Sequence, residues 1–306
     1  MTGLSTRISI IIPNLNSPVI LATLRSLQNQ AWPEEGGEIL VVGRDEANLL
    51  ATWADRRVRF IDTSRPVCAA AARNRGIAEA QGDVLIFVDS DCLAQPGWLE
   101  TLLGRMAGGE DVVAGSVTFP ADNYWTLADN LSMFHDFMPH MPAGSRPYLP
   151  TLTLAIRRHV AEVVGPLDET FPGAAGEDID WTIRMRLAGF RLYFEPRAQV
   201  MHTPPRTGPR GVIRHWWRSG ASMTRVRLRY AEDYGTPAAA RSPVWLTVLS
   251  PLVAGWVSAK IWWQHPPLRS HWKAWPVVFA TKLLWCWGGA SFLLATRRVR
   301  EETAYA

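Results

Sequence analysis

Apolar and polar residues follow two different rhythms along the first two hundred residues of the chain. Short runs rich in Ile, Val and Leu predict buried strands, and apolar residues that recur every three to four positions predict helices. We expect strands at residues 8–12, 38–42, 58–61, 84–88, 111–119, 151–156, 191–194 and 198–201, and helices at 19–29, 69–80, 98–107 and 178–188. Strands that alternate with helices predict an α/β fold with a mixed, mainly parallel sheet flanked by helices.

The apolar run at 84–88 is followed by two carboxylates, Asp89 and Asp91. In an extended chain, residues i and i+2 project to the same side, so both carboxylates can face one divalent cation. Open α/β sheets bind their ligands at this carboxyl end of the strands. The same residues also suit a plain turn after a strand, because Asp and Ser favour turns. The pattern by itself leaves both interpretations open.

After residue 205 the composition changes, and we divide the chain into regions 1–205 and 206–306. The second region begins with a basic, Trp-containing stretch that is expected to be helical. Two apolar segments follow, Val244–Trp263 and Pro276–Ala295, each with about the twenty residues that span a bilayer. They predict a hydrophobic helical tail, either a hairpin with both ends in the cytoplasm or amphipathic helices lying in the membrane interface. A soluble helical tail packed on the core is the third alternative.

Charge and aromatic residues support an association with a membrane. Ten of the fifteen tryptophans follow residue 215, where they are interleaved with arginines. This mixture indicates a membrane interface or an anionic ligand, and no motif for nucleic acid accompanies it. The N-terminal apolar run at 8–12 is too short for the core of a signal peptide, so we expect the membrane contact elsewhere. Three cysteines without metal-site or disulfide spacing fit a reducing compartment.

A series of short motifs spans most of the first region. They are Ile-Ile-Pro-Asn-Leu-Asn (11–16), Ala-Arg-Asn-Arg-Gly (72–76), Gly-Asp (82–83) with Val-Asp-Ser-Asp (88–91), Arg-Arg (157–158), Val-Gly-Pro-Leu-Asp-Glu (164–169), Gly-Glu-Asp-Ile-Asp (176–180) and Met-His (201–202). Their order and spacing resemble family 2 glycosyltransferases. The resemblance implies a GT-A fold, which is Rossmann-like, for the catalytic region 1–205. It also implies metal-dependent transfer of one sugar from a nucleotide-diphosphate-sugar, with inversion.

The resemblance assigns the metal and the base. Asp91, Asp89 and His202 are expected to hold a divalent Mn or Mg ion, which neutralises the departing diphosphate. Asp178 is expected to be the catalytic base that takes the proton of the acceptor hydroxyl, with Glu177 as the second candidate. Without the resemblance, each of these side chains also fits a plain structural role, such as a cap at a helix N-terminus.

The nucleotide-sugar site is expected to combine several loops. Residues that match the family's nucleotide-contacting positions are Pro13, Asn14, Asn16, Asp45, Arg73, Asn74 and Asp89. The second strand departs from the pattern, because it ends in Val-Gly-Arg-Asp (42–45) where relatives usually have an acidic pair followed by Gly-Ser. A UDP-sugar is the expected donor, and this departure leaves the base open. Cys92 is a second departure, since a third Asp often stands there.

We therefore predict a hexosyltransferase-type enzyme at the cytoplasmic side of the cell membrane. Its acceptor would be a glycan, a lipid-linked glycan or a metabolite, and its attachment would be peripheral or through a C-terminal helical hairpin. One alternative is a catalytically silent membrane-anchored scaffold of the same fold. Another is a sugar nucleotidyltransferase, which is disfavoured because the N-terminal loop lacks the glycine-rich basic signature of that class.

Overall fold

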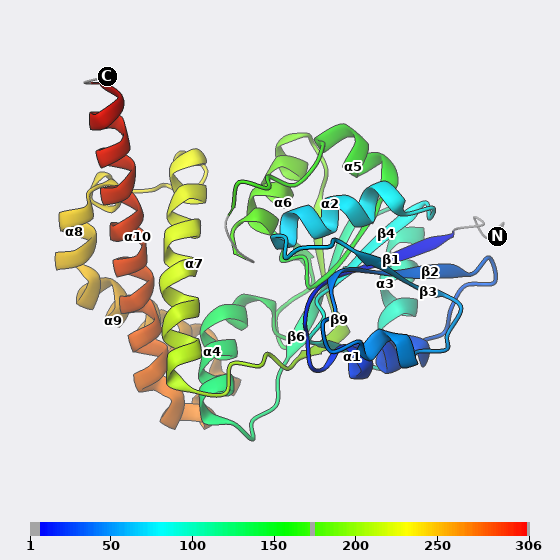
Figure 1. Cartoon of the computed structure of the whole chain (residues 1–306). Helices are drawn as coiled ribbons and strands as arrows, with labels where there is room; N and C mark the ends of the chain where they lie inside the picture. Colours follow the sequence, from blue (N-terminus) through cyan, green and yellow to red (C-terminus); the bar gives the residue numbers. More distant parts are fainter. Residues whose placement is uncertain (1–6, 172–174, 305–306) are drawn as a thin grey trace. The chain divides into compact units, whose positions relative to one another are not determined.

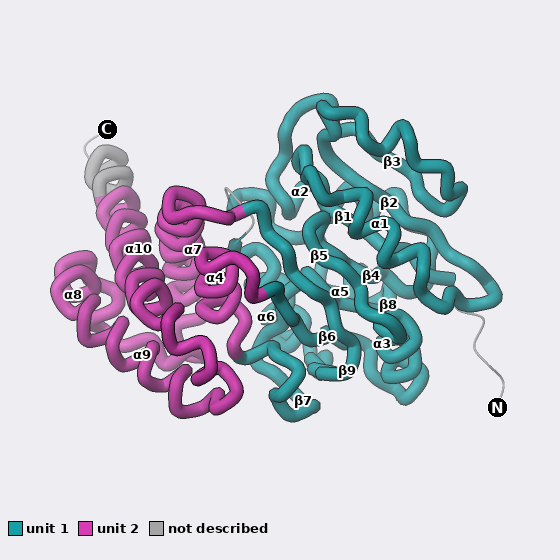
Figure 2. Tube along the Cα trace, turned by 90° about the horizontal axis from the view of Figure 1, so that it is seen from below, with its two compact units in different colours: residues 1–120, 136–205 teal, residues 121–135, 206–306 magenta. Residues whose placement is uncertain are grey.

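The structure is a computed structural model that describes residues 7–171 and 175–304, with side chains up to residue 297. It divides into two units. Unit 1 comprises residues 1–120 and 136–205, and unit 2 comprises residues 121–135 and 206–306 (Figure 2). The segment 121–135, which the sequence analysis counted with the N-terminal region, therefore groups with the C-terminal helices.

Unit 1 is built on a single mixed sheet flanked by helices (Figure 1), as predicted. The strands lie in the order β3-β2-β1-β4-β8-β6-β9-β5, and β7 pairs with β9. Strands β1 to β4 are mutually parallel, whereas β8 runs antiparallel to both β4 and β6. The strand bounds are β1 Ile8–Leu15, β2 Gly37–Arg44, β3 Val58–Asp62, β4 Val84–Val88, β5 Cys92–Ala94, β6 Val112–Thr118, β7 Gly144–Ser145, β8 Thr153–Arg157 and β9 Leu192–His202.

The central strands are apolar because helices cover them. All five residues of β4 are buried, and so are the first five of β1. The helices of unit 1 are α1 Ile20–Gln28, α2 Ala69–Glu79, α3 Trp98–Ala107, α5 Arg158–Val164 and α6 Glu177–Leu187, with the 3₁₀ turns η1 Leu49–Thr52 and η2 His135–Phe137 at or near its loops. The two strands expected at 191–194 and 198–201 form one continuous strand, β9.

Unit 2 is helical. Its elements are α4 Tyr124–Phe134, α7 Pro209–Arg229, η3 Ala238–Arg241, α8 Pro243–Val248, α9 Ser250–Gln264, η4 Pro266–Ala274 and α10 Trp275–Ala304. Helix α10 contacts α7 on one side and α8 and α9 on the other (Figures 1 and 2). Helix α4 lies in a proline-rich region where the sequence pattern predicted no helix. Asn123 caps this helix by accepting hydrogen bonds from the N–H groups of Trp125 and Thr126.

Glycines allow α7 and α10 to approach closely. A Cβ on Gly220 of α7 would lie 2.1 Å from the carbonyl oxygen of Trp285, and one on Gly288 of α10 would lie 2.0 Å from that of Trp217. No side chain fits in either place. Small residues at a helix contact are typical of helices that associate by backbone packing.

The structure contains one candidate membrane span within the described residues, where the sequence analysis expected two. Residues Pro266–Arg297 are long and apolar enough by length and composition, with mean hydropathy 1.5. The other expected span is divided into α8 and α9. Pro251 explains the break, because it has no N–H to continue the helical hydrogen bonds.

Candidate active site at the carboxyl ends of the strands

The loop that follows β4 is held from two sides. Ser90 uses its backbone carbonyl to accept hydrogen bonds from the hydroxyls of Ser17 and Thr23, each 3.0 Å long. The backbone N–H of Cys92 donates to the carbonyl of Asp89 at 3.0 Å. These bonds fix the direction in which the two carboxylates of the loop project.

A possible metal site lies beside this loop. Cys92 in β5 and His202 in β9 are direct partners across antiparallel strands, so their side chains are neighbours. Asp91 joins them, with Oδ1 3.7 Å from Nε2 of His202. The potential ligand atoms of the three residues all lie within 4.8 Å of one another. The backbone N–H and the hydroxyl of Thr203 both donate to the Asp91 carbonyl, at 2.8 and 3.0 Å.

The donor set fits a divalent cation. Carboxylate oxygen and imidazole nitrogen suit Mn²⁺, and the thiol of Cys92 adds a softer ligand that favours Zn²⁺. The sequence analysis named Asp91 and His202 but did not include Cys92. The register between β5 and β9 places Cys92 beside His202, and this register links residues more than a hundred positions apart.

Asp89 takes a different partner. Its Oδ1 accepts a 2.7 Å hydrogen bond from Arg73 of α2, whose side chain is only 3% exposed. A second nitrogen of the same guanidinium donates to Oε1 of Glu177 at 2.9 Å. Arg73 therefore connects the loop after β4 to the first residue of α6. We find this arginine inside the site, bound to two carboxylates.

The carboxylates around Arg73 are crowded. Burial, together with the negative charge of Asp178, raises the pKa of Glu177 to about 8 against the opposing effect of Arg73. Burial also raises the pKa of Asp178, with a smaller contribution from Asp89. Burial alone would lower the pKa of Arg73, but Asp89, Glu177 and Asp178 together raise it. One arginine faces three carboxylates, so the cluster retains a proton to higher pH than isolated acids would.

Asp178 and Glu177 differ in their access to solvent. Glu177 is 1% exposed, whereas Asp178 is only half-buried. The Asp178 carboxylate accepts from the N–H of Ile179 at 2.8 Å and from the backbone N–H of Thr151. Asp178 is thus a fixed carboxylate with an accessible edge and a raised pKa, which suits the acceptance of a proton from a bound hydroxyl.

The expected nucleotide-binding asparagines hold the loop after β1. Asn14 donates from Nδ2 to the carbonyl of Arg44 at 2.7 Å and accepts from the N–H of Ser17. Asn16 has a left-handed backbone, with φ 55°, and its Oδ1 accepts from the N–H of Glu46 at 2.8 Å. These side chains tie the end of β1 to the end of β2, and Pro13 lies half-buried in β1 beside them.

Gly43 lies where the second strand departs from the family pattern, and its surroundings leave no room for a side chain. Its φ is +141°, and a Cβ there would lie 1.9 Å from the carbonyl oxygen of Asn14. Only glycine fits. Asp45, two residues later, accepts a 2.7 Å hydrogen bond from the N–H of Leu50 and so starts η1.

Asn74 supports a loop. Its Nδ2 donates to the carbonyl of Leu167 and to Glu169, while its Oδ1 accepts from the N–H of Leu167 at 2.9 Å. Both sides of the amide are therefore used by the segment 167–169, which lies between α5 and α6.

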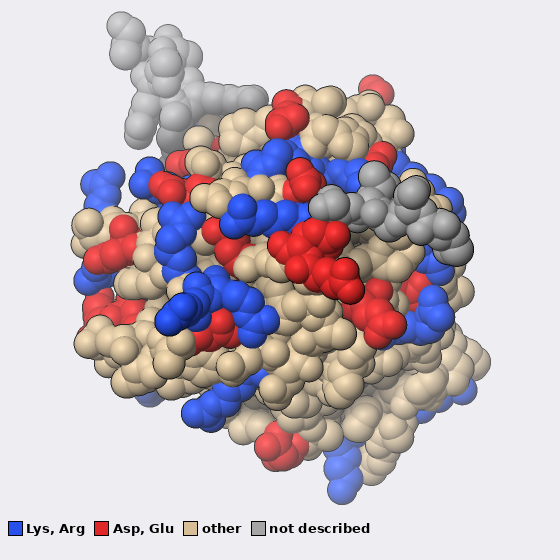
Figure 3. All heavy atoms as spheres, turned by 90° about the vertical axis from the view of Figure 1, so that its right-hand side faces the viewer, with Lys and Arg blue, Asp and Glu red and all other residues tan. Residues whose placement is uncertain are grey.

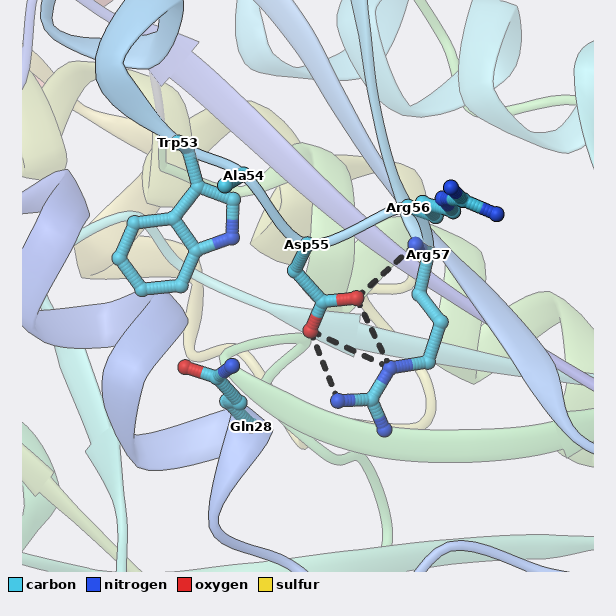
Figure 4. A pocket seen from close by; sticks show the side chains of 6 residues that line it. All are labelled: Gln28, Trp53, Ala54, Asp55, Arg56 and Arg57. Atoms are coloured by element: carbon cyan, nitrogen blue, oxygen red, sulfur yellow. Dashed lines mark hydrogen bonds and ion pairs between the residues drawn. The ribbon is translucent and has the colours of Figure 1, made fainter.

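A hollow of about 520 Å³ lies elsewhere on unit 1 (Figure 4). It is lined by Gln28, Trp53, Ala54, Asp55, Arg56 and Arg57. Gln28 ends α1 and the other five residues precede β3, whereas the site described above lies where the parallel strands end. None of the residues predicted from the sequence lines this hollow. Asp55 is held there by Arg57 at 2.7 Å.

On the face of the molecule in Figure 3, acidic and basic side chains are interspersed.

Comparisons with known proteins agree with the fold. The family model described as Glycosyl transferase family 2 matches residues 9–165. The glycosyltransferase AglE of Haloferax volcanii is 30% identical over 74% of this chain and 79% of its own length. A pre-mycofactocin glycosyltransferase of Mycobacterium tuberculosis is 35% identical over 44% of this chain, but the match spans only 29% of that relative.

Two solved structures share the fold at low sequence identity. The mannosyltransferase PcManGT of Pyrobaculum calidifontis, in complex with GDP-Man and Mn²⁺, has a TM-score of 0.59 and 17% identity over 97% of this chain and 76% of its own. GalNAc-T7 with UDP, GalNAc and Mn²⁺ has a TM-score of 0.52 and 16% identity over 64% of this chain and 44% of its own.

Proposed function

This chain belongs to glycosyltransferase family 2, and on that basis we propose that it transfers one sugar from a nucleoside-diphosphate-sugar to an acceptor hydroxyl with inversion. The observation that carries the proposal is the Arg73 bridge. It joins the loop that bears Asp89 to the helix that bears Asp178. A donor-side loop and a candidate base are thereby fixed in one rigid unit.

The donor side needs groups that neutralise a leaving diphosphate. Asp91 and His202 would hold Mn²⁺ or Mg²⁺, and such an ion supplies positive charge to the departing phosphate oxygens. Asp89 would orient the nucleotide from its fixed position on Arg73. The loops that contain Pro13, Asn14, Asn16 and Asp45 would surround the nucleoside, with their backbone geometry set by the hydrogen bonds described above.

The acceptor side needs a base. Asp178 would take the proton of the acceptor hydroxyl as its oxygen attacks the anomeric carbon. The bond from that carbon to the diphosphate oxygen breaks, and the nucleoside diphosphate leaves with the bonding electrons. Glu177 is buried behind Asp178, where a retained proton would limit the negative charge near the base. Its burial makes it the less suitable base of the two.

We place the reaction at the cytoplasmic face of the cell membrane, with a glycan, a lipid-linked glycan or a metabolite as the acceptor. The exposed tryptophans of the second unit support this placement. A UDP-sugar is the expected donor. Because the two structures of similar fold contain UDP or GDP-Man, both nucleotides belong in the test.

The proposal is tested by the release of nucleoside diphosphate from a panel of UDP- and GDP-sugars, with Mn²⁺, Mg²⁺ or EDTA. We expect turnover of one donor that EDTA abolishes and that Asp91→Ala and Asp178→Asn both remove. Failure of every donor to bind in the presence of metal would overturn the proposal. Turnover that continues undiminished in EDTA would overturn the metal role alone.

A further inference from the structure

Unit 2 has an unusual distribution of polar and apolar side chains. Among the residues that the structure describes, thirteen of the seventeen exposed large hydrophobic side chains belong to this unit. Its interior combines apolar residues with many polar ones. The buried polar residues of unit 2 are Thr126, Asp129, Asn130, Ser132, Ser219, Ser222, Thr224, Thr236, Ser250, Ser258, His265 and Thr281. So many large apolar side chains on the outside are unusual for a helical bundle surrounded by water.

Helix α9 shows most clearly that large apolar side chains are exposed while small polar ones are buried. Its exposed positions include Leu252, Trp256 and Trp263, which are 71%, 73% and 73% exposed. Its buried face carries Ser250 and Ser258, among other small or apolar residues. The large side chains therefore point away from the protein, where water alone would give them no favourable contact.

Exposed apolar side chains line one face of each of these two helices. Trp245 and Val248 lie three residues apart on α8, and Leu252, Trp256 and Trp263 follow one another at four and seven residues on α9. Positions at these spacings lie on the same face of a helix. An exposed apolar surface of this extent marks a contact with a membrane or a protein. We call the five side chains the α8–α9 stripe.

The charges around the stripe favour a membrane over a protein partner. Residues 234–300 contain no Asp or Glu, and residues 206–300 contain fifteen of the chain's 32 Lys and Arg but only two of its 28 acidic residues. Exposed Lys260 lies on α9 itself. The guanidinium of Arg269 lies 5.7 Å from the ring of Trp263. Tryptophan beside a cation, without any acid, suits the headgroup layer of an anionic bilayer.

The same residues distinguish lying on the membrane from crossing it. Helix α9 has fifteen residues, which at 1.5 Å each gives about 22 Å, shorter than the roughly 30 Å of a bilayer core. Helix α10 is long enough, but it packs against α4, α7, α8 and α9 of the same unit. Its Lys282 donates to the carbonyl of Ser132 at 2.8 Å and lies 4.6 Å from the ring of Trp216.

We infer that the α8–α9 stripe docks unit 2 onto an anionic lipid surface, with α8 and α9 lying in the interface plane and α10 remaining within the protein. The inference refines the membrane placement of the proposed function and does not depend on sugar transfer. Trp256 and Trp263 insert among the acyl chains, while Lys260 and the surrounding cations contact the headgroup phosphates.

The test uses the full chain and vesicles, without any donor. Sedimentation is measured with vesicles of phosphatidylcholine alone and with vesicles that contain equal amounts of phosphatidylglycerol. We expect binding to the anionic vesicles, at least tenfold weaker for the double variant Trp256→Ser/Trp263→Ser. Val163→Ser, which removes an equally exposed apolar side chain of unit 1, is the matched control and should bind as the unaltered chain does.

A second readout separates the two modes of attachment. An alkaline carbonate wash of cell membranes should release the chain, because interfacial helices detach and spanning helices do not. Resistance to the wash would overturn the inference in favour of a spanning α10. Undiminished vesicle binding by the double variant would also overturn it. The thermal midpoint of the double variant should be unchanged, since both indoles already face outward. Nucleotide-sugar turnover in detergent is measured separately, because it tests the proposed function and not the membrane contact.

Discussion

The guanidinium of Arg73 donates a 2.9 Å hydrogen bond to Oε1 of Glu177, although the two residues are 104 positions apart in the sequence. Both side chains are almost fully buried. The pair links α2 to the start of α6 and, through Asp89, to the loop after β4. Most of the electrostatic properties of the site follow from this one contact.

Removal of Arg73 should destabilise unit 1. Arg73→Met would leave Asp89 and Glu177 without their shared cation, and the loss of one partner of a buried pair costs about 3–5 kcal/mol. The matched control is Arg75→Met on the same helix, whose exposed side chain pairs with Glu79 and should contribute only about 0.3–0.5 kcal/mol. Urea denaturation measures both. Equal losses in the two variants would contradict the central role of Arg73.

Stability should fall as the pH rises from about 4.5 to about 8. The pKa of Glu177 is raised from 4.5 to about 8 in the folded chain, so between these values the native state binds more protons than the unfolded state. The contribution of Glu177 to the free energy of unfolding therefore decreases as the pH rises through this window. It is largest below pH 4.5. Glu177→Gln should flatten the slope. Denaturation midpoints of both proteins are measured across the pH range. An identical dependence of stability on pH in Glu177→Gln and in the unaltered chain would refute the prediction.

Asp178→Asn should lower the turnover rate by about 10²–10⁴-fold, the usual contribution of a general base. Donor affinity should change little, because Asp178 lies on the acceptor side in our proposal. The measurements are turnover and donor titration by calorimetry. If this variant stays active while Glu177→Gln loses activity, then Glu177 is the base.

Cys92 should control the choice of metal. Cys92→Asp replaces a soft ligand with a hard one, so we expect Mn²⁺ affinity to rise and Zn²⁺ affinity to fall, each by about tenfold. Calorimetric titration with each ion provides the readout, and Cys68→Ser, which alters a cysteine outside the cluster, is the control. Unchanged affinities in Cys92→Asp would place its side chain outside the coordination sphere.

Gly288→Ala should separate α7 from α10. The new Cβ would lie 2.0 Å from the backbone of Trp217, and such overpacking costs at least about 1–3 kcal/mol. Gly104→Ala in α3 has open space around it and should stabilise the chain by about 0.5–1 kcal/mol instead. Thermal melting compares the two, and a neutral Gly288→Ala would show that the helices can move apart freely.

Local patterns were sufficient to predict most of the sheet. The run at 84–88 and the carboxylates after it indicate a strand end with a polar loop, because burial on both faces selects consecutive apolar residues. The helix α4 was missed because prolines surround it. None of them lies within Tyr124–Phe134, and the capping Asn123 was a readable signal.

Two contacts in the candidate site depend on long-range packing and could not be predicted from local sequence patterns. The approach of Cys92 to His202 depends on the register of β5 against β9, and the contact between Arg73 and Glu177 depends on how two distant helices pack. Neither depends on local spacing. The break between α8 and α9 was visible as Pro251, but a count of apolar residues ignores it.

The tight fit of Gly43 limits how the donor preference of this enzyme could be redesigned. An acidic pair cannot simply be transplanted to the end of β2, because any side chain at position 43 would collide with the backbone of Asn14. Retargeting toward another nucleobase would instead have to begin at Arg44 and Asp45, or remodel both strands together. Directed evolution of this segment can therefore vary positions 44 and 45 but must keep glycine at position 43.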